Sequence, residues 1–218
     1  DKDFDRQVLR TKKRPIASGR ITTKLSFIYV LILCFLAFLI LINFNFLTIV
    51  LGMSSMILAF SYPFMKRITY WPQLFLGITF NWGIIMSWSA INDSISTEII
   101  ILYVSAIFWT LGYDTIYGAQ DMSDDEIIGL KSTSIKFKKN IKLFLSSAYI
   151  IVILLNLYLF KSYLGLNIFS LIFLLFCSTL LYQLLKFNKN KSKKYLNLFK
   201  INNYSGLLLF LGIFTINI

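Results

Sequence analysis

The chain has 218 residues, of which 57% are hydrophobic and only 15% are charged, and its formal net charge is +12. A soluble domain carries about 25% charged residues, and several apolar runs here reach the ~20 residues that cross a bilayer, which argues against a single soluble core. The sequence contains no histidine, which excludes imidazole-based zinc or haem sites and an imidazole general base.

The chain opens on an acidic segment that becomes basic. Asp1 and Asp5 stand four residues apart, Asp3 lies between them, and the basic run 10–15 follows. If this segment is helical, Asp1 and Asp5 lie on one face, one turn apart, where their like charges repel each other. A bound divalent cation removes that repulsion, and Mg²⁺ prefers oxygen ligands. Asp1 and Asp5 are therefore candidate metal ligands.

Seven apolar spans follow, which predicts an all-α fold, a polytopic membrane helix bundle. Each span is bounded by polar or charged residues and is close to the length that a membrane-spanning helix needs. The spans cover about residues 25–43, 46–65, 72–91, 98–116, 142–160, 164–185 and 203–218. We expect residues 1–218 to form one transmembrane domain.

The loops between the spans divide sharply by charge. Of the 22 lysines and arginines, all except Lys161 fall in the segments 1–24, 66–67, 113–142 and 186–200. With seven spans, these segments lie on one side of the membrane, which the positive-inside rule identifies as the cytoplasmic or matrix side. The basic charge therefore sets the topology and favours anionic lipid head groups. Nucleic-acid binding is not indicated, because the aromatic residues lie in the apolar spans.

A short cationic segment closes the second span. Lys66 and Arg67 follow Tyr62 and Pro63 there, at the level where a phosphate group arriving at the inner rim meets the bundle. Arginine binds phosphate oxygens bidentately, and lysine acts as a point charge. Both residues are therefore candidate ligands for a diphosphate, whose developing negative charge they can stabilise.

A second acidic cluster follows the fourth span. Asp121 and Asp125 repeat the four-residue spacing of Asp1 and Asp5 and fall on the same side of the membrane. Mg²⁺ is usually held by one or two carboxylates together with substrate phosphates, so two facing pairs can hold two or more ions around a diphosphate. We interpret the remaining acids of both clusters as solvated side chains.

At these residues the chain resembles the UbiA family of intramembrane aromatic prenyltransferases. Residues 1–19 are similar to the end of its first motif, N-D-x-x-D-x-x-x-D, with the R-T-x-x-R-P-x-x-S-G continuation. Residues 62–77 resemble its middle segment with a Y-x-x-x-K element, 114–132 its second aspartate motif, and 202–207 its C-terminal segment. The family has nine transmembrane helices, so the resemblance implies that the first helix and most of the second precede this chain.

The resemblance also implies a role for each candidate residue. Four aspartates would hold Mg²⁺ on a prenyl diphosphate: Asp1, Asp5, Asp121 and Asp125. Four cations would contact the diphosphate: Arg14, Lys66, Arg67 and Lys131. The groups implied in catalysis are Asp5, Arg67, Asp121 and Asp125. Two further residues would line the same pocket: Asp114 and Tyr117.

The implied reaction is Mg²⁺-dependent transfer of a polyprenyl group from polyprenyl diphosphate to the ring of 4-hydroxybenzoate, ortho to its hydroxyl, in ubiquinone biosynthesis. The implied partners are those two substrates and membrane lipid. The simple loops and the absence of a visible transit peptide favour the bacterial inner membrane, with the active site on the cytoplasmic side. The mitochondrial inner membrane is the alternative.

Two other functions stay open. Another member of the same family, such as the haem-farnesylating enzyme, shares an R-T-x-x-R-P type of first motif, although the second motif here fits the hydroxybenzoate branch better. A membrane cation transporter is the alternative outside this class of enzyme. Functional acids of transporters usually lie within the spans near the midplane, whereas both aspartate clusters here lie at the inner rim, which favours chemistry on a head group.

Overall fold

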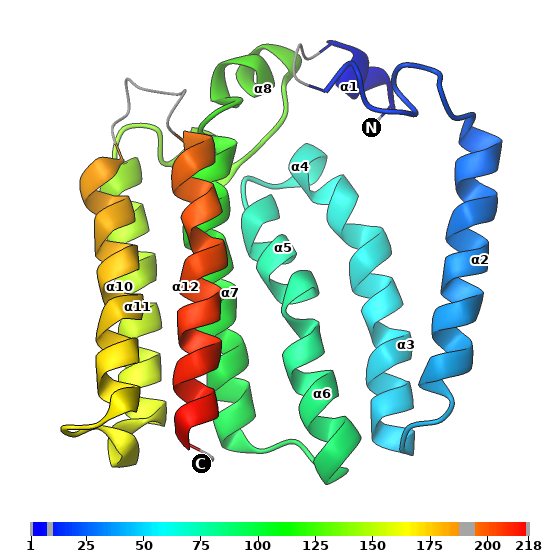
Figure 1. The fold of residues 1–218 in the computed structure, drawn as a ribbon. Helices are drawn as coiled ribbons and strands as arrows, with labels where there is room; N and C mark the ends of the chain where they lie inside the picture. The colour runs from blue at the N-terminus through cyan, green and yellow to red at the C-terminus, as the bar shows by residue number, and fades with distance from the viewer. Residues whose placement is uncertain (1, 8–10, 188–194, 217–218) are drawn as a thin grey trace.

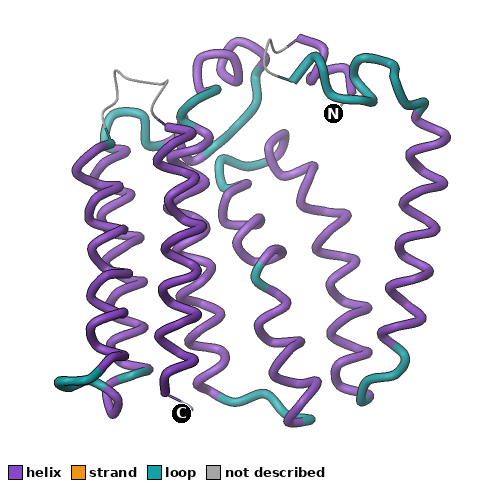
Figure 2. The backbone as a smooth tube through the Cα atoms, in the orientation of Figure 1, coloured by secondary structure: helices purple, strands orange, loops and turns teal. Residues whose placement is uncertain are grey.

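The computed structural model of the chain describes residues 2–7, 11–187 and 195–216 (Figure 1). Every regular element in these ranges is a helix (Figure 2). Seven helical stretches within them are long and apolar enough to cross a membrane, which confirms the predicted all-α membrane bundle. They are Thr23–Leu41, Phe46–Ile68, Pro72–Asn92, Thr97–Gly118, Ile141–Leu159, Ile168–Lys186 and Tyr195–Ile216.

Five of these stretches are unbroken helices, and two are divided. The unbroken helices are α2 (Thr23–Leu41), α7 (Thr97–Gly118), α10 (Ile141–Leu159), α11 (Ile168–Lys186) and α12 (Tyr195–Ile216). The divided stretches contain α3 (Phe46–Ser61), η1 (Tyr62–Phe64), α4 (Met65–Ile68), α5 (Pro72–Phe80) and α6 (Trp82–Asn92). The short helices outside the spans are α1 (Lys2–Gln7), α8 (Met122–Ile128), α9 (Thr133–Lys136) and η2 (Lys161–Tyr163).

Helix α12 begins earlier than the predicted start near residue 203, because polar residues close to its start find partners inside the bundle. The side-chain oxygen of Asn202 accepts a hydrogen bond from Trp109 Nε1 at 2.9 Å, and its amide nitrogen donates to Gln183 Oε1 at 3.1 Å. Tyr195 is buried and stacks on Phe187, with ring centroids 5.2 Å apart. With its amide bonded, Asn202 avoids the cost of a buried unsatisfied group, and the helix extends through a polar stretch.

The third span is broken at Asn81, where the sequence predicts one continuous helix over 72–91. The side-chain nitrogen of Asn81 donates to the carbonyl oxygen of Gly77 and to Thr110 Oγ1, both at 2.8 Å. Its backbone, at φ −88° and ψ 2°, departs from helical geometry, and α6 begins at the next residue. Asparagine side chains compete with the helix for backbone groups. The bond to Thr110 on α7 fixes the position of the break.

Helix α7 is the most buried of the spans and packs against α5, α10 and α12. Its Gly112 lies directly against the ring of Tyr149 on α10, so a Cβ atom at this position would overlap that ring. Tyr149 is only 1% exposed, and its hydroxyl donates to Gln183 Oε1 at 2.8 Å. The ring is therefore held in place, and only glycine fits opposite it.

We expect Gly112→Ala to lower the free energy of unfolding by about 1–3 kcal/mol, the usual cost of overpacking a tight core. Thermal unfolding in detergent, followed by circular dichroism, measures this loss. Gly83→Ala in α6 is the matched control, because nothing lies within 4 Å of the Cβ that it adds. Equal unfolding midpoints for the two variants would contradict the tight packing of α7 on α10.

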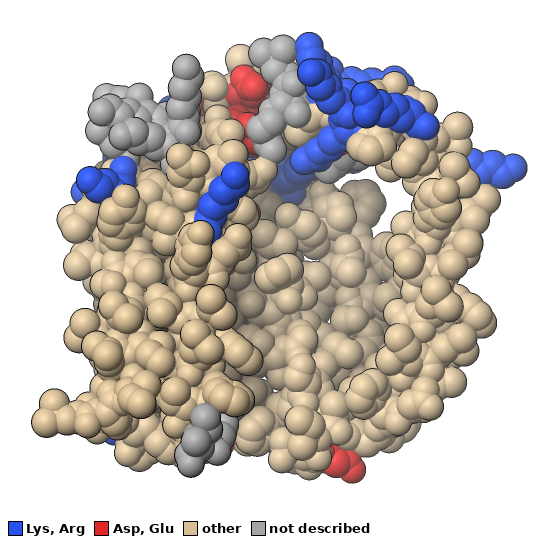
Figure 3. Space-filling model, in the orientation of Figure 1, with Lys and Arg blue, Asp and Glu red and all other residues tan. Residues whose placement is uncertain are grey.

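One end of the bundle collects the charged residues. Helices α1 and α8 lie across this end (Figure 1), and Figure 3 shows lysines and arginines gathered there above sides built from uncharged residues. We call it the charged end. Below it, the space-filling view shows a hollow with uncharged walls beside α2 (Figure 3), a helix that has no buried residue.

Candidate active site

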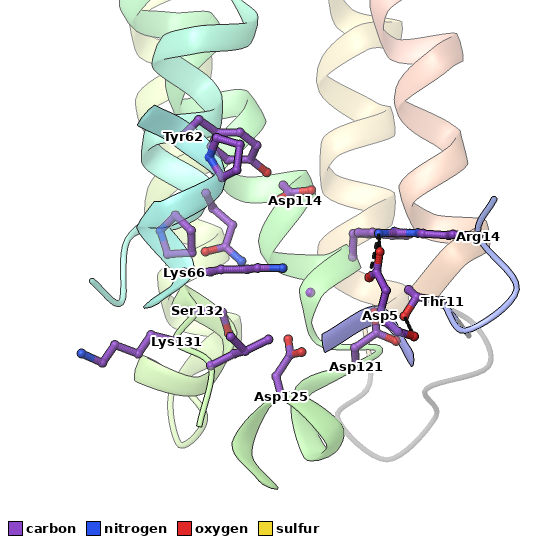
Figure 4. Close-up of a pocket in the computed structure, with 16 residues that line it drawn as sticks. Asp5, Thr11, Arg14, Tyr62, Lys66, Asp114, Asp121, Asp125, Lys131 and Ser132 are labelled. Atoms are coloured by element: carbon purple, nitrogen blue, oxygen red, sulfur yellow. Dashed lines mark hydrogen bonds and ion pairs between the residues drawn. The ribbon is translucent and has the colours of Figure 1, made fainter. Parts of the chain in front are cut away.

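A cavity of about 320 Å³ opens at the charged end, where α1, α4, α5, α7 and α8 meet (Figure 4). We call it the charged cavity. Its lining residues are Asp5, Thr11, Arg14, Tyr62, Pro63, Lys66, Pro72, Gln73, Asp114, Tyr117, Gly118, Asp121, Asp125, Leu130, Lys131 and Ser132. The volume is that of a small-ligand pocket. Asp5 from the first acidic cluster thus lines the same cavity as Asp121 and Asp125 from the second, although the two clusters are distant in the sequence.

Helix α8 positions two of the aspartates that line the charged cavity. Asp121 directly precedes the helix, and the backbone N–H of Asp125 donates to the Asp121 carbonyl oxygen at 2.9 Å. Their carboxylates therefore lie one helical turn apart, as the sequence spacing predicts. Gly129 ends α8 at a φ of 78°, which glycine adopts readily. The turn returns the chain to the cavity wall at Leu130.

Other acids of the same two clusters do not line the cavity. Glu126 forms an ion pair with Lys138 at 2.6 Å, and a carboxylate oxygen of Asp3 lies 3.7 Å from Arg6 Nη1. Asp124 is also not among the lining residues. The structure therefore divides each cluster into acids that face the cavity and acids that do not.

Asp5 reaches the cavity from α1. Its carboxylate accepts two hydrogen bonds from Arg14 Nη1, at 3.0 and 3.1 Å, and Thr11 Oγ1 donates to the Asp5 carbonyl oxygen at 2.9 Å. These bonds hold Thr11 and Arg14 against α1 and keep Arg14 on the cavity wall. Asp1, predicted to pair with Asp5, lies outside the described residues.

Lys66 faces the acids from the opposite wall (Figure 4). It comes from α4, and the 3₁₀ turn η1 around Pro63 separates this helix from α3. Proline lacks the N–H that would continue the α-helix. The ammonium group is close enough to the carboxylates of Asp5 and Asp125 to interact with both electrostatically. Tyr62, one turn before Lys66, lines the same wall.

The other two predicted diphosphate contacts lie differently. Arg67 is exposed and not among the lining residues, and its guanidinium lies 5.9 Å from the centroid of the Phe64 ring. Lys131 lines the cavity, and its backbone N–H donates to the Lys66 carbonyl oxygen at 2.8 Å. The Lys131 ammonium, however, donates to the carbonyl oxygen of Ile68 at 3.1 Å and points away from the acids (Figure 4).

Buried hydrogen bonds connect helix α9, which follows Lys131 and Ser132 of the cavity wall, to α5 and α7. Gln73 Oε1 accepts from the backbone N–H of Thr133 at 3.0 Å, and the hydroxyls of Thr133 and Thr115 share a bond of 2.6 Å. Ser134 Oγ donates to the Thr115 carbonyl oxygen at 2.8 Å. The polar lining residues that the sequence did not predict are Thr11, Tyr62, Gln73 and Ser132. For Gln73 the available signal was a polar side chain in the first turn of an otherwise apolar helix.

Asp114 and Tyr117 line the cavity from the end of α7, as predicted for pocket residues. Both are half-buried, and the charge of Asp114 acts on the hydroxyl of Tyr62. The Tyr117 ring packs on Phe199 of α12, with centroids 4.7 Å apart. These contacts connect the cavity wall at the end of α7 to η1 and to α12.

Comparison with known proteins decides the family. The model of the UbiA prenyltransferase family matches residues 1–207. The chain belongs to this family. The apo structure of a UbiA homolog from Aeropyrum pernix K1 matches it with a TM-score of 0.83 and 21% identity, over 100% of this chain and 82% of that one. This likeness shows a shared fold.

Several curated relatives carry one name, "4-hydroxybenzoate polyprenyltransferase, mitochondrial". The proteins from Bos taurus and Homo sapiens are each 50% identical over 147 residues, which are 67% of this chain and 40% of theirs. The Arabidopsis thaliana protein is 48% identical over the same length, 36% of its own chain. The matched region thus spans about two fifths of the length of these relatives.

UbiA prenyltransferases generally use divalent metal ions, and the donors of the charged cavity fit one. Within the described residues, no group of three or more acidic or thiol side chains is arranged to hold a metal ion by itself. The cavity instead offers the separate carboxylates of Asp5, Asp121 and Asp125. Mg²⁺ is usually bound by one or two carboxylates together with substrate phosphates. The donor set therefore suits an ion bound jointly with a diphosphate.

Proposed function

We propose that the full-length protein transfers a polyprenyl group from polyprenyl diphosphate to the ring carbon of 4-hydroxybenzoate ortho to its hydroxyl, with Mg²⁺ as cofactor. The observation that carries the proposal is the charged cavity, in which Asp5, Asp121 and Asp125 face Lys66 in a member of the UbiA family. The name shared by the relatives supports the aromatic acceptor.

The cavity walls supply the electrostatic part of the reaction. Mg²⁺ bound by Asp5, Asp121 and Asp125 would neutralise charge on the diphosphate. Lys66 and Arg14 add fixed positive charge beside it, which stabilises the negative charge that develops as the allylic C–O bond breaks. Asp1 keeps its predicted metal role as part of this proposal.

The part of the cavity wall formed by the end of α7 positions the acceptor. In this proposal the ring of 4-hydroxybenzoate lies near Asp114 and Tyr117, the two half-buried residues at the end of α7. The ring carbon ortho to the hydroxyl forms a bond to the allylic carbon as the allylic C–O bond to diphosphate breaks. That ring carbon then releases its proton to the diphosphate, which leaves at the charged end. Half-burial limits the access of water, which would otherwise capture the allylic cation.

The apolar interior supplies a route for the isoprenoid tail. Figure 3 shows a hollow with uncharged walls directly below the charged end. A polyprenyl chain in contact with such walls and with lipid stays out of water, which is favourable in proportion to its apolar area. The diphosphate can then lie in the charged cavity while the tail follows the hollow.

The position of the acids separates this proposal from a cation transporter. Asp5, Asp121 and Asp125 lie in or beside the short helices α1 and α8, outside the seven spans. Acids that conduct ions across a membrane usually lie near the midplane of the spans. Transfer of a farnesyl group to haem by the same cavity is the second candidate within the family.

An assay of the full-length protein in membranes tests the proposal. We expect prenylated 4-hydroxybenzoate to form from polyprenyl diphosphate, to depend on Mg²⁺ and to disappear with a chelator. Haem offered as the acceptor in parallel membranes distinguishes the two candidates. Prenylated haem without prenylated hydroxybenzoate contradicts the proposal, and cation flux in proteoliposomes without any prenyl transfer favours the transporter.

We further propose that the charged end faces the cytoplasm or the matrix. This orientation rests on the loop charges, since the four basic segments flank one end of the spans. The relatives' names assign those proteins to mitochondria, which supports the mitochondrial inner membrane over the bacterial one. A single domain over residues 1–218 stays a prediction.

A further inference from the structure

A second cavity lies at the charged end, where the basic loops meet the apolar spans. It has a volume of about 550 Å³ and lies where α10 begins and α11 ends. Its lining residues are Lys139, Asn140, Ile141, Lys142, Leu143, Leu185 and Phe187, and none of them is acidic. None of them lines the charged cavity. We call it the rim cavity.

The two lysines of the rim cavity differ from the basic residues around them. Lys138 forms an ion pair with Glu126, and the ammonium of Lys136 lies 4.4 Å from the ring centroid of Trp71. Lys139 and Lys142 are both exposed, and no hydrogen bond, ion pair or ring contact joins either ammonium to another described residue. Among the described residues, two exposed positive charges thus line one cavity that has no acidic residue in its lining.

The lower wall of the rim cavity is apolar and open to lipid. Leu143 is 70% exposed and Leu185 is 67% exposed, each near the end of a membrane-spanning helix. Side chains of this kind at that level contact acyl chains. The rim cavity is therefore lined both by two cationic groups and by exposed leucines, which suits the charged head group and the acyl chains of an anionic phospholipid.

We propose that the rim cavity binds an anionic phospholipid, with its phosphate between Lys139 and Lys142 and its acyl chains against Leu143 and Leu185. Basic pockets between transmembrane helices on the cytoplasmic or matrix side bind lipid head groups in this way. The two lysines supply charge complementarity for the phosphate, and the exposed leucines favour a lipid over a free phosphate ion. The site goes beyond prenyl transfer, and its test does not depend on that activity.

Titration of short-chain phosphatidylglycerol into the detergent-solubilised full chain, followed by native mass spectrometry, measures the binding. We expect Lys139→Gln with Lys142→Gln to weaken it roughly 25-fold, because each lysine near a membrane surface contributes a factor of about five. Lys12→Gln with Lys13→Gln is the matched control, since it removes two charges at the charged end without touching the rim cavity. Lys139→Arg with Lys142→Arg should retain binding, because both positive charges remain.

Three competitors separate the possible ligands. Phosphatidylcholine tests charge selectivity, inorganic phosphate tests whether the acyl chains matter, and a soluble prenyl diphosphate tests for a second substrate site. Tighter binding of phosphatidylglycerol than of all three supports the proposal. Equal binding of any competitor overturns it, and so does an equal loss in the control pair. Both pairs alter exposed side chains, so unchanged unfolding midpoints accompany the expected result.

Discussion

Replacing Asp121 by alanine in the full-length protein should reduce Mg²⁺-dependent prenyl transfer by at least ~10²-fold, the usual cost of removing one group that stabilises transition-state charge. The carboxylate lines the charged cavity. Asp121 precedes α8 without a side-chain capping bond to it, so the substitution does not remove a helix cap. The loss should therefore appear in turnover and in Mg²⁺ dependence, while membrane insertion stays unchanged.

Asp124→Ala is the matched control for this experiment. Asp124 lies in the first turn of the same helix and is not among the lining residues. Both variants remove one negative charge from the same short segment. Product formation at several Mg²⁺ concentrations compares them, together with the amount of protein in the membrane. Near-normal turnover of Asp121→Ala, or an equal loss in both variants, would remove Asp121 from the metal site.

Replacing Lys66 by methionine should also have a large effect, because Lys66 faces the carboxylates of the charged cavity (Figure 4). Methionine has an unbranched side chain that is only one atom shorter, and it carries no charge. We expect kcat/KM for the polyprenyl diphosphate to fall by about 10²-fold or more, since a charge-assisted contact to a phosphate in a partly buried site is lost. Initial rates over a range of diphosphate concentrations measure the change.

Arg67→Met and Lys131→Met are the controls for Lys66→Met. Each removes one positive charge near the same wall, but Arg67 is not among the lining residues and the Lys131 ammonium donates to the Ile68 carbonyl. We expect both to reduce kcat/KM less than Lys66→Met does. A larger loss for Arg67→Met would support its predicted catalytic role and would contradict the assignment of the main diphosphate contact to Lys66.

Much of this architecture follows from the sequence. Apolar spans of bilayer length predict the helical bundle. The loops between them are alternately rich and poor in lysine and arginine, which places both acidic clusters at one end. The four-residue spacing of Asp121 and Asp125 predicts that they lie one turn apart, and the backbone bond between them has that geometry. These predictions depend only on local periodicity and on net charge per loop.

The predictions that failed depend on contacts between distant helices. Asn81 breaks the third span because it bonds to Thr110 on α7, and α12 extends to Tyr195 because Asn202 finds Gln183 on α11. A hydropathy pattern records the polarity of these residues but not whether a partner is present. A polar residue within a span therefore gives the same signal in the sequence whether the helix breaks at that residue or continues through it.

The sequence by itself determined the class of this protein, its seven spans, the end that carries its charges and the residue types available there. Only the tertiary structure decided which of those residues share the cavity. Successive side chains on a helix point about 100° apart, so packing of α4 turns Lys66 toward the acids and leaves its neighbour Arg67 exposed. That rotation is fixed by burial against other helices, a long-range property that no local motif contains.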